Sequence, residues 1–337
     1  MNSRERVWAA LRGEPLDRPP ASFWGHFYDR ESSAAELAAA AAEGQHRYGW
    51  DWVKLNPRKH YHVEPWGVTY RYSGSRTEKP VLTSWPIKRP TDWSSITPRP
   101  HDQGALGEQI EAVRLTRAAL PKDVPLIETV FTPLAILGEM VEGPEELRDA
   151  LRSHPAAVRS ALEAVTQTFE KFVRAVLAAG AEGIFLATVD WGAQRMLSAG
   201  EHREWSRPHD RRLLDAARGA PFNVLHVCKS RNLLTEVADY PVKAFSWDAL
   251  DPTNLSLGAG LLKLRGAAMG GISYDTSLAT ADPERLGAEY SRGLEATGGR
   301  RWLVAPGCSI PPSTSPSNLE AVRDAVHATR LKEMPLP

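Results

Sequence analysis

The sequence predicts an α/β fold, a (β/α)8 barrel, from two observations. Short apolar runs, of the length that buried parallel strands need, recur along the whole chain. Stretches with apolar residues at helical spacing lie between several of them. Eight alternating strand and helix units are typical of a closed barrel, whose active site lies at the carboxyl ends of the strands.

The expected strands are apolar segments, and in chain order they are Ala21–Gly25, Trp52–Leu55, Pro125–Phe131, Gly183–Val189, Phe222–Val227, Ala244–Trp247, Ala267–Ile272 and Trp302–Ala305. The clearest expected helices are Pro155–Leu177, Glu201–Arg218, Pro283–Ala296 and Pro316–His327. The last has a defined start, because Ser315 can cap it and Pro316 occupies the first helical position, where its missing N–H costs nothing.

A long polar insertion, residues 56–100, follows the second expected strand. Within it, His62–Trp66 and Val68–Tyr72 flank Gly67 and predict a β-hairpin, and residues 85–104 are proline-rich and predict irregular coil. Loops this long in a compact domain are usually lids or binding loops. Because neither internal repeats nor a low-complexity linker occur, we expect residues 1–337 to form a single barrel domain.

Composition indicates an ordinary globular enzyme. The chain has 337 residues, 42% hydrophobic and 24% charged, and its formal net charge is zero, which argues against nucleic acid or an acidic membrane surface as a partner. The first residues lack the apolar region of a signal peptide, and no apolar run is long enough for a transmembrane helix. Two cysteines in so long a chain suit a reducing compartment, so we expect a cytoplasmic protein.

The two cysteines predict a metal site. Cys228 stands in Leu225-His226-Val227-Cys228 at the end of the fifth strand, and Cys308 follows the eighth, after Gly307. Side chains at i and i+2 of a strand point to the same face, so His226 and Cys228 aim together. Histidine and thiolate are the usual ligands of Zn²⁺. The alternatives are two unrelated buried cysteines, which behave as small hydrophobes, or a disulfide.

Two further segments are distinctive: Arg4–Pro20, RERVWAALRGEPLDRPP, and Gly307–Leu319, GCSIPPSTSPSNL. Both resemble the uroporphyrinogen decarboxylase superfamily, and the resemblance implies a barrel similar to those of uroporphyrinogen decarboxylase and cobalamin-independent methionine synthase. Within this superfamily, H-x-C followed much later by a cysteine after strand eight resembles the zinc pattern of the methylcorrinoid:thiol methyltransferases. Cobalamin-independent methionine synthase has a similar pattern.

The resemblance implies a zinc-dependent S-methyltransferase with His226, Cys228 and Cys308 as ligands. It implies a further acidic ligand after strand six, where this chain has Asp248 instead of the usual glutamate, and Asp251 is the alternative. We expect His226 to donate its second ring N–H to a carbonyl or carboxylate, which would fix its orientation.

Two residues at other strand ends are candidates for catalysis or substrate binding. Asp190, after strand four, resembles the acidic residue that holds the substrate amino group in methionine synthases, and an N-cap or a surface carboxylate is an equally good interpretation. His26 ends strand one and is either a pocket donor or a structural residue.

Further polar residues gather around strand two and the insertion. They are Asp51, Lys54, Asn56, Arg58 and Glu64, of which we expect one or two to reach substrate and most to form a solvated rim. His60 and His62 alternate in the insertion but would need a third ligand to hold a metal.

The methyl donor is expected to come from outside the chain. A corrinoid-binding module carries D-x-H-x-x-G, which is missing here, so a methylcorrinoid would arrive on a separate protein. A methyl-folate donor is the alternative, and the acceptor would be a small thiol such as homocysteine or coenzyme M. The chain could assemble as a homodimer.

Two other functions stay open at this point. The first is a uroporphyrinogen decarboxylase-like lyase acting on a tetrapyrrole or related carboxylate without metal, although Gly25–Arg30 lacks the arginine-rich motif of those enzymes. The second is a non-catalytic barrel in which zinc only stabilises the fold.

Overall fold

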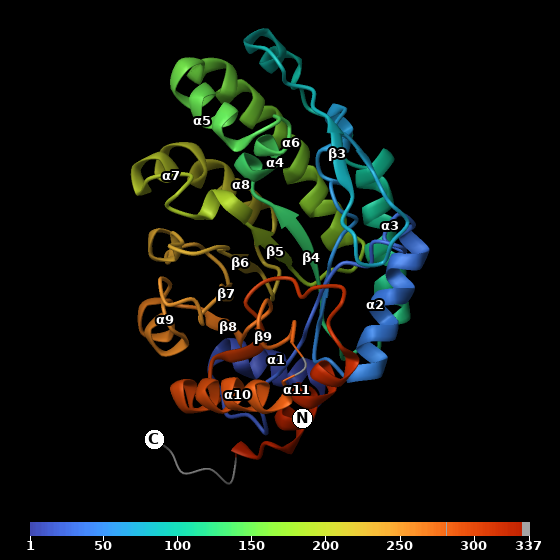
Figure 1. The fold of residues 1–337 in the computed structure, drawn as a ribbon, viewed down its shortest axis with the longest axis vertical. Helices are drawn as coiled ribbons and strands as arrows, with labels where there is room; N and C mark the ends of the chain where they lie inside the picture. The colour runs from blue at the N-terminus through green and yellow to red at the C-terminus, as the bar shows by residue number, and fades with distance from the viewer. Residues whose placement is uncertain (281, 332–337) are drawn as a thin grey trace.

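The computed structural model describes residues 1–280 and 282–331 and confirms the predicted barrel. Parallel strands form one curled sheet in the order β1-β4-β5-β6-β7-β8-β9, with helices packed around it (Figure 1). Their bounds are β1 Val53–Leu55, β4 Leu126–Phe131, β5 Ile184–Ala187, β6 Val224–His226, β7 Ala244–Ser246, β8 Ala267–Ile272 and β9 Trp302–Pro306. Each lies within or at most one residue beyond an expected strand.

The first expected strand, Ala21–Gly25, lies between β9 and β1, the position of the first strand in a closed barrel, but it does not form a regular hydrogen-bonded ladder. It makes isolated parallel bridges, Ala21 with Val304 of β9 and Gly25 with Ile310. On its other side, Asp51 N donates to Ala21 O at 2.9 Å and Ser22 Oγ donates to Trp52 O at 2.7 Å. The prolines that precede this segment lack an N–H, which limits regular pairing at its start. The segment closes the barrel between β9 and β1 with few hydrogen bonds.

The helices have the bounds α1 Ser3–Arg12, α2 Ala34–Tyr48, α3 Gly104–Ala119, α4 Pro133–Gly138, α5 Pro144–Ser153, α6 Pro155–Ala178, α7 Ala199–Trp205, α8 Arg207–Ala216, α9 Leu257–Lys263, α10 Pro283–Thr297 and α11 Pro316–Ala328. Helix α11 begins as expected, with the Ser315 side chain accepting from Ser317 N. The expected helix Glu201–Arg218 is wrong as one element: it is divided at Ser206, because Pro208 cannot donate within a continuous helix but fits the first turn of α8.

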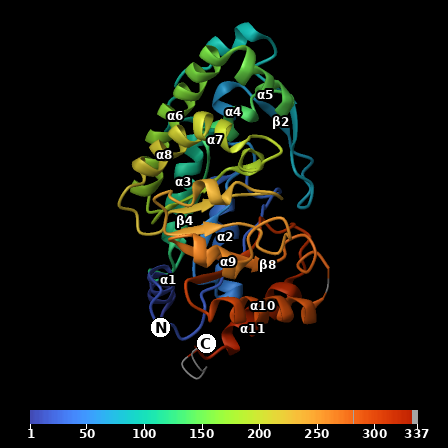
Figure 2. The ribbon, with the colours of Figure 1, turned by 90° about the vertical axis from the view of Figure 1, so that its left-hand side faces the viewer.

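The insertion after β1 contains a hairpin, but not the predicted one. Glu64–Trp66 is a 3₁₀ turn, η1, that ends at Gly67 with φ 92°, because Pro65 cannot donate to a ladder. The hairpin instead pairs β2, Thr69–Arg71, antiparallel with β3, Val81–Ser84. It lies at the edge of the molecule, apart from the barrel sheet (Figure 2). A second 3₁₀ segment, η2 Pro90–Ser95, occupies part of the region expected to be coil.

The barrel interior is filled by large apolar side chains, among them Trp52, Ile127, Phe185, Phe222 and Leu303. Helix α1 packs against the amino ends of the strands, where Trp8 meets Phe222 edge to face with ring centroids 5.7 Å apart. The end opposite α1, where the carboxyl ends of the strands meet, is therefore the end at which side chains can meet a ligand. None of the helices in residues 1–280 and 282–331 is long and apolar enough to cross a membrane.

Asp51, expected on a solvated rim, is instead a buried junction at the amino end of β1. Its carboxylate accepts from Arg6 Nη1 at 2.7 Å, from Arg18 Nη1 at 2.7 Å and from Ala21 N at 2.9 Å. These contacts connect α1, the closing segment and β1. Only 1% of Asp51 is exposed.

We predict that Asp51→Ala lowers the free energy of unfolding by about 3–5 kcal/mol, because Arg18 loses its carboxylate partner, Arg6 keeps only Asp17, and the buried N–H of Ala21 loses its acceptor. Urea unfolding at pH 7 would measure it. Glu14→Ala, which removes the exposed partner of Arg12, is the control and should change stability by less than about 1 kcal/mol. A loss at position 51 no larger than this control would contradict the assigned role.

Candidate metal centre

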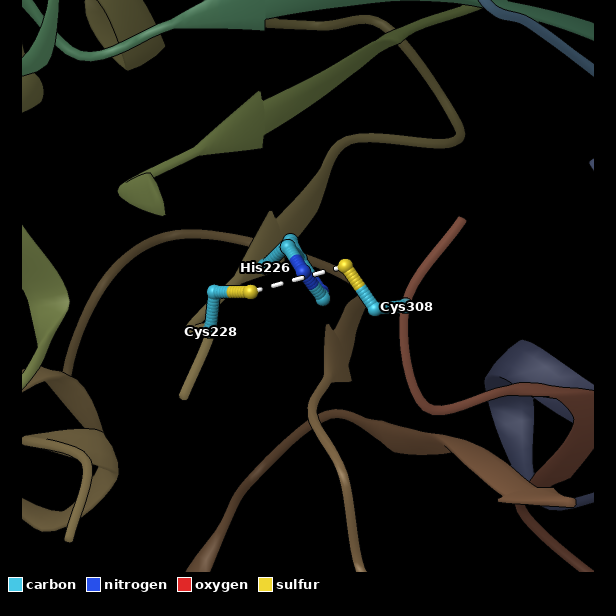
Figure 3. Close-up of side chains that lie close together, drawn as sticks. All are labelled: His226, Cys228 and Cys308. Atoms are coloured by element: carbon cyan, nitrogen blue, oxygen red, sulfur yellow. Dashed lines mark hydrogen bonds between the residues drawn. The ribbon is translucent and has the colours of Figure 1, made fainter. Parts of the chain in front are cut away.

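Three of the predicted ligands meet at the carboxyl end of the barrel. One ligand atom each from His226, Cys228 and Cys308 lies within 4.8 Å of the others, and the two sulfurs are 3.5 Å apart (Figure 3). His226 is the last residue of β6, Cys228 follows it by two residues, and Cys308 follows β9 by two residues. Both cysteines are free thiols, so the disulfide alternative is not formed. We call these three residues the thiol–imidazole cluster.

Gly307 allows Cys308 to reach this position. A Cβ at residue 307 would lie 2.9 Å from Cγ of Asp248, closer than real Cβ atoms come to other atoms, and 3.0 Å from its Cα, which is also tight. Without a side chain, the turn after β9 packs directly on the segment that follows β7. Glycine is therefore needed at position 307 for this close approach.

The orientation of His226 is fixed by its neighbours. Its Nδ1 lies 3.0 Å from Ser246 Oγ, and its ring stacks on Phe185 with centroids 5.1 Å apart. Strand register explains the first contact, since His226 pairs directly with Ser246 between β6 and β7. The expected carbonyl or carboxylate partner is therefore wrong, and a buried hydroxyl takes its place. Nε2 is left as the ring nitrogen available to a metal.

The two thiols differ in acidity because they share a hydrogen bond. The pKa of Cys308 lies well below its ordinary value, since it accepts from the Cys228 thiol and is also hydrogen-bonded and attracted to His226. The same hydrogen bond, with burial, raises the pKa of Cys228. One of the two sulfurs thus favours the thiolate form, which is the form that binds metals.

The two aspartates considered for a fourth ligand lie outside the cluster. Among the described residues, the group of ligand atoms within 4.8 Å of one another contains neither. Asp248 follows β7, packs beside Gly307 and accepts from Leu250 N at 3.1 Å, and burial raises its pKa. Asp251 is engaged in its own turn, where it accepts from Ser230 Oγ and from both N and Oγ1 of Thr253.

The other two predicted site residues have partners of their own. Asp190 lies in a 3₁₀ turn, η3 Val189–Gly192, is substantially exposed, and pairs with Arg195 and with Lys229 Nζ at 3.6 Å. The His26 Nδ1 lies 2.8 Å from the fully buried carboxylate of Glu31. Burial lowers the pKa of His26, although Glu31 opposes the shift. Glu31 was missed because it lies in an irregular loop, where no periodic signal marks a buried residue.

Lys54 and Asn56 belong to the five polar residues of which we expected one or two to reach substrate and most to form a solvated rim, and the structure buries both. Lys54 is 5% exposed and Asn56 6%. The Lys54 ammonium donates to Asn56 Oδ1 and lies 4.7 Å from the ring centroid of Phe185. Burial lowers the pKa of Lys54 to about 7. A cavity of about 210 Å³ beside α2 is lined in part by Lys54, Asn56 and His26, whereas the thiol–imidazole cluster does not line it.

His60 and His62 do share a third group, Glu139. Its Oε2 lies 2.9 Å from His60 Nδ1 and 3.2 Å from His62 Nε2, and Lys59 Nζ lies 3.7 Å from its other oxygen. Among the described residues these three do not form a group of ligand atoms close enough for a metal. They tie the insertion to the end of α4 instead.

Comparison with known proteins agrees with this architecture. Residues 2–329 match the uroporphyrinogen decarboxylase (URO-D) family, as the resemblance implied. A methylcobamide:CoM methyltransferase of Methanosarcina barkeri is 22% identical, over 96% of this chain and 98% of the relative. A uroporphyrinogen decarboxylase of Nitrosococcus oceani is 27% identical, over 75% of this chain and 70% of the relative.

Two solved structures share the fold. A methyltransferase from Methanosarcina mazei superposes with a TM-score of 0.80 at 21% identity, covering 97% of this chain and 98% of its own. A B12-independent methionine synthase from Shewanella sp. W3-18-1 has a TM-score of 0.58 at 12% identity, covering 93% of each chain.

The buried ammonium of Lys54 leads to a stability prediction with a defined pH dependence. Below pH 7 Lys54 is charged in both folded and unfolded chains, so the cost of burying the charge is fully present. Between pH 7 and about 10 the folded chain releases the proton while the unfolded chain keeps it, so wild-type stability rises.

Lys54→Met should therefore raise the free energy of unfolding at pH 6.5 by on the order of 2 kcal/mol. The gain should shrink by pH 9.5. Urea unfolding at both pH values checks this, with the exposed Lys243→Met as the matched control. A variant less stable than wild type at pH 6.5 would show that Lys54 is not an unfavourably buried charge.

Proposed function

This chain belongs to the uroporphyrinogen decarboxylase family, and within that family we propose that it is a zinc-dependent methyltransferase. The proposed reaction moves a methyl group from a methylcorrinoid to a small thiol such as coenzyme M. The single observation that carries the proposal is the thiol–imidazole cluster at the carboxyl end of the barrel.

The donor set of the cluster fits Zn²⁺. Two sulfurs and one imidazole nitrogen are ligands that zinc prefers, and three protein ligands leave a position for substrate, as in catalytic zinc sites. Bonds of about 2.3 Å at a tetrahedral angle put two sulfurs about 3.8 Å apart, close to the 3.5 Å between Cys228 and Cys308. Asp248 or Asp251 could become a fourth ligand only after its carboxylate moved toward the cluster.

Bound zinc would supply a Lewis acid that lowers the pKa of an acceptor thiol, so that the thiol would release its proton to solvent near neutral pH. The residues of the chain orient the His226 ring and keep water away from the inner side of the cluster. Ser246 holds Nδ1 of His226, Phe185 packs against its ring, and the buried strand ends exclude water from the side of the barrel core. A thiolate is a far better nucleophile than a thiol, and low dielectric strengthens the electrostatic interactions that favour it.

The relatives support a corrinoid donor carried by another protein. Methylcobamide:CoM methyltransferases of Methanosarcina align with this chain over nearly their whole length. A separate corrinoid protein would dock over the open end of the barrel. A methyl-folate is the alternative donor. With either donor, the acceptor thiolate would attack the methyl group.

The structure favours coenzyme M over homocysteine as the first acceptor to test. Asp190, the residue proposed to bind an amino group, already pairs with Arg195 and Lys229 and would have to leave them. We retain His26 as a donor at the pocket, because Glu31 fixes its ring and 18% of its side chain is exposed.

A metal-free decarboxylase is the second candidate, favoured by relatives of that name at 25–27% identity over 75–79% of this chain. A decarboxylase would have no use for paired thiols beside an imidazole, so metal content discriminates between the two functions.

We predict about one zinc per chain in purified protein, measured by mass spectrometry of the metal. Cys228→Ser or Cys308→Ser should lose most of it. Ser246→Ala should weaken zinc binding roughly 10- to 100-fold, measured against a competing chelator, because it releases the imidazole. The exposed Ser94→Ala is its control. Full zinc occupancy in the double cysteine variant would refute the proposed site.

With methylcobalamin as donor, demethylation can be followed by its colour change while thiols are varied. We expect coenzyme M or homocysteine to be methylated, the zinc-free protein to be inactive, and added zinc to restore activity. Asp190→Ala should impair homocysteine selectively if that carboxylate binds its ammonium. Failure with every thiol from corrinoid and folate donors, together with tetrapyrrole decarboxylation by zinc-free protein, would establish the second candidate instead.

A further inference from the structure

His26 and Glu31 form a buried acid–base pair just after the segment Ala21–Gly25 that closes the barrel. The His26 Nδ1 lies 2.8 Å from Glu31 Oε2, and the Glu31 side chain is fully buried. The other carboxylate oxygen, Oε1, accepts from Lys59 N at 2.9 Å and from the Tyr72 hydroxyl at 3.1 Å. Both of these donors belong to the insertion that follows β1. The insertion thus holds the carboxylate, and the carboxylate holds the imidazole.

The contacts of Glu31 determine which ring nitrogen of His26 carries hydrogen. An ionised carboxylate only accepts, and here it accepts from a backbone N–H, a hydroxyl and the imidazole. Nδ1 of the imidazole therefore carries the hydrogen that lies between the ring and Glu31. In a neutral imidazole the other nitrogen, Nε2, then has a free lone pair and is an acceptor.

His26 is neutral at pH 7 in these surroundings. Burial lowers its pKa, and the positive charges of Lys59 and Lys54 act in the same direction, whereas Glu31 opposes them. Tyr28 stacks on the ring with centroids 4.8 Å apart. The neighbours leave 18% of the His26 side chain exposed. A neutral, partly accessible imidazole with a free Nε2 is able to take a proton from a ligand.

His26 lies next to the chain segment that carries Cys308. Gly25 forms a parallel bridge with Ile310, and Ile310 N donates to Trp24 O at 2.9 Å. Trp24 belongs to the apolar cluster that fills the barrel interior. Because side chains two residues apart on an extended segment point to the same face, the His26 ring follows Trp24 toward the carboxyl ends of the strands. The thiol–imidazole cluster lies at that same end.

Charge balance gives this imidazole a use in the proposed reaction. When an acceptor thiol loses its proton at the cluster, a negative charge appears beside a water-poor barrel interior. If the proton left for solvent, that charge would be unbalanced in a medium of low dielectric constant, which is unfavourable. If the imidazole took the proton, the imidazolium would balance the thiolate and would itself be stabilised by Glu31.

We propose that His26 is the catalytic proton acceptor for the thiol substrate and that Glu31 is the residue that positions it. The S–H bond of the bound thiol breaks, its proton forms a bond to Nε2 of His26, and the sulfur keeps the electron pair with which it attacks the methyl group. This inference rests on the proposed function and changes one step of it, since the proton stays in the site instead of passing directly to solvent. His26 becomes a donor only after it has taken this proton.

A proton count on thiol binding tests the proposal without any methyl transfer. Isothermal titration of coenzyme M into zinc-loaded protein at pH 7.5, in two buffers with different heats of ionisation, gives the number of protons released. We expect about 0.3 protons or fewer for the wild type and about one for His26→Asn. His46→Asn, on an exposed histidine of α2, is the control and should match the wild type. Release of about one proton by the wild type overturns the proposal.

Imidazole ¹⁵N NMR of the wild type identifies the group that takes the proton and does not depend on a variant that folds. In the zinc-loaded protein we expect hydrogen on Nδ1 of His26 and none on Nε2, and addition of coenzyme M should protonate Nε2. An Nε2 that stays unprotonated when the thiol is bound overturns the proposal. So does a proton count that rises in Lys54→Met but not in His26→Asn, because Lys54 would then be the acceptor.

Glu31→Gln tests the positioning role through the tautomer. The amide oxygen must face the donors Lys59 N and Tyr72, so the amide NH₂ faces His26 and makes Nδ1 an acceptor. Hydrogen then moves to Nε2, which loses its lone pair. We expect this tautomer in the NMR spectrum, unchanged zinc content, and kcat/KM with methylcobalamin lower by roughly 100-fold, as for His26→Asn. Wild-type kcat/KM in Glu31→Gln despite the altered tautomer would refute the role of Nε2.

Zinc content and thiol binding separate this inference from the proposed function. If the protein binds neither zinc nor thiol, the proposed function fails, and this inference fails with it. If both bind, and the wild type and His26→Asn release the same number of protons, the inference alone fails and the methyltransferase stands.

Discussion

The constraint on which the site depends is the shared direction of the strands. Because all strands of the sheet run parallel, the residues that end β6 and β9 reach the same rim, although 80 positions separate the two cysteines. The register of β6 against β7 then places Ser246 beside His226, and Gly307 lets the turn after β9 approach Asp248 closely. These contacts all lie at the carboxyl ends of the strands, because the strands of the barrel run in one direction and α1 covers their amino ends.

The molecule places its charges in two different ways. Asp51 is buried with two arginines and a backbone N–H, so its charge is compensated and stabilises the junction of α1, the closing segment and β1. Lys54, three residues further along, is also buried, but its ammonium donates to an amide instead of a carboxylate, and the negative charge of buried Glu128 acts on it without a hydrogen bond among the described residues. The first arrangement supports the fold, whereas the second costs stability, which is the pattern expected where a protein keeps a group for a ligand.

Much of the architecture could be predicted because buried strands, and the residues at their carboxyl ends, form patterns that are visible in a short stretch of sequence. Apolar runs located the strands within a few residues, and H-x-C on a strand indicated that His226 and Cys228 share a face. The rest depends on contacts that no local pattern encodes. The hairpin forms between β2 and β3 instead of around Gly67, because Pro65 prevents pairing there. The burial of Lys54 was not predicted because polarity alone does not show which charged residues are buried, and Glu31 lies in an irregular loop that gives no periodic signal. Asp248 shows the same limit: a position after a strand does not fix where its carboxylate points.

Few hydrogen bonds join the segment Ala21–Gly25 to β9 and β1, and this affects where the barrel can open locally. Elsewhere the sheet is held by continuous ladders, but at Ala21–Gly25 the connection rests on isolated bridges and a few hydrogen bonds to β9 and to the residues just before β1. Amide protons along this seam should exchange with solvent faster than those of β4 or β5, because fewer bonds must open. The seam is followed directly by His26 and lies beside Trp52, the residue before the strand that contains Lys54. Local opening there would widen the barrel on the side of its buried donors, without disturbing the strands that present the two thiols.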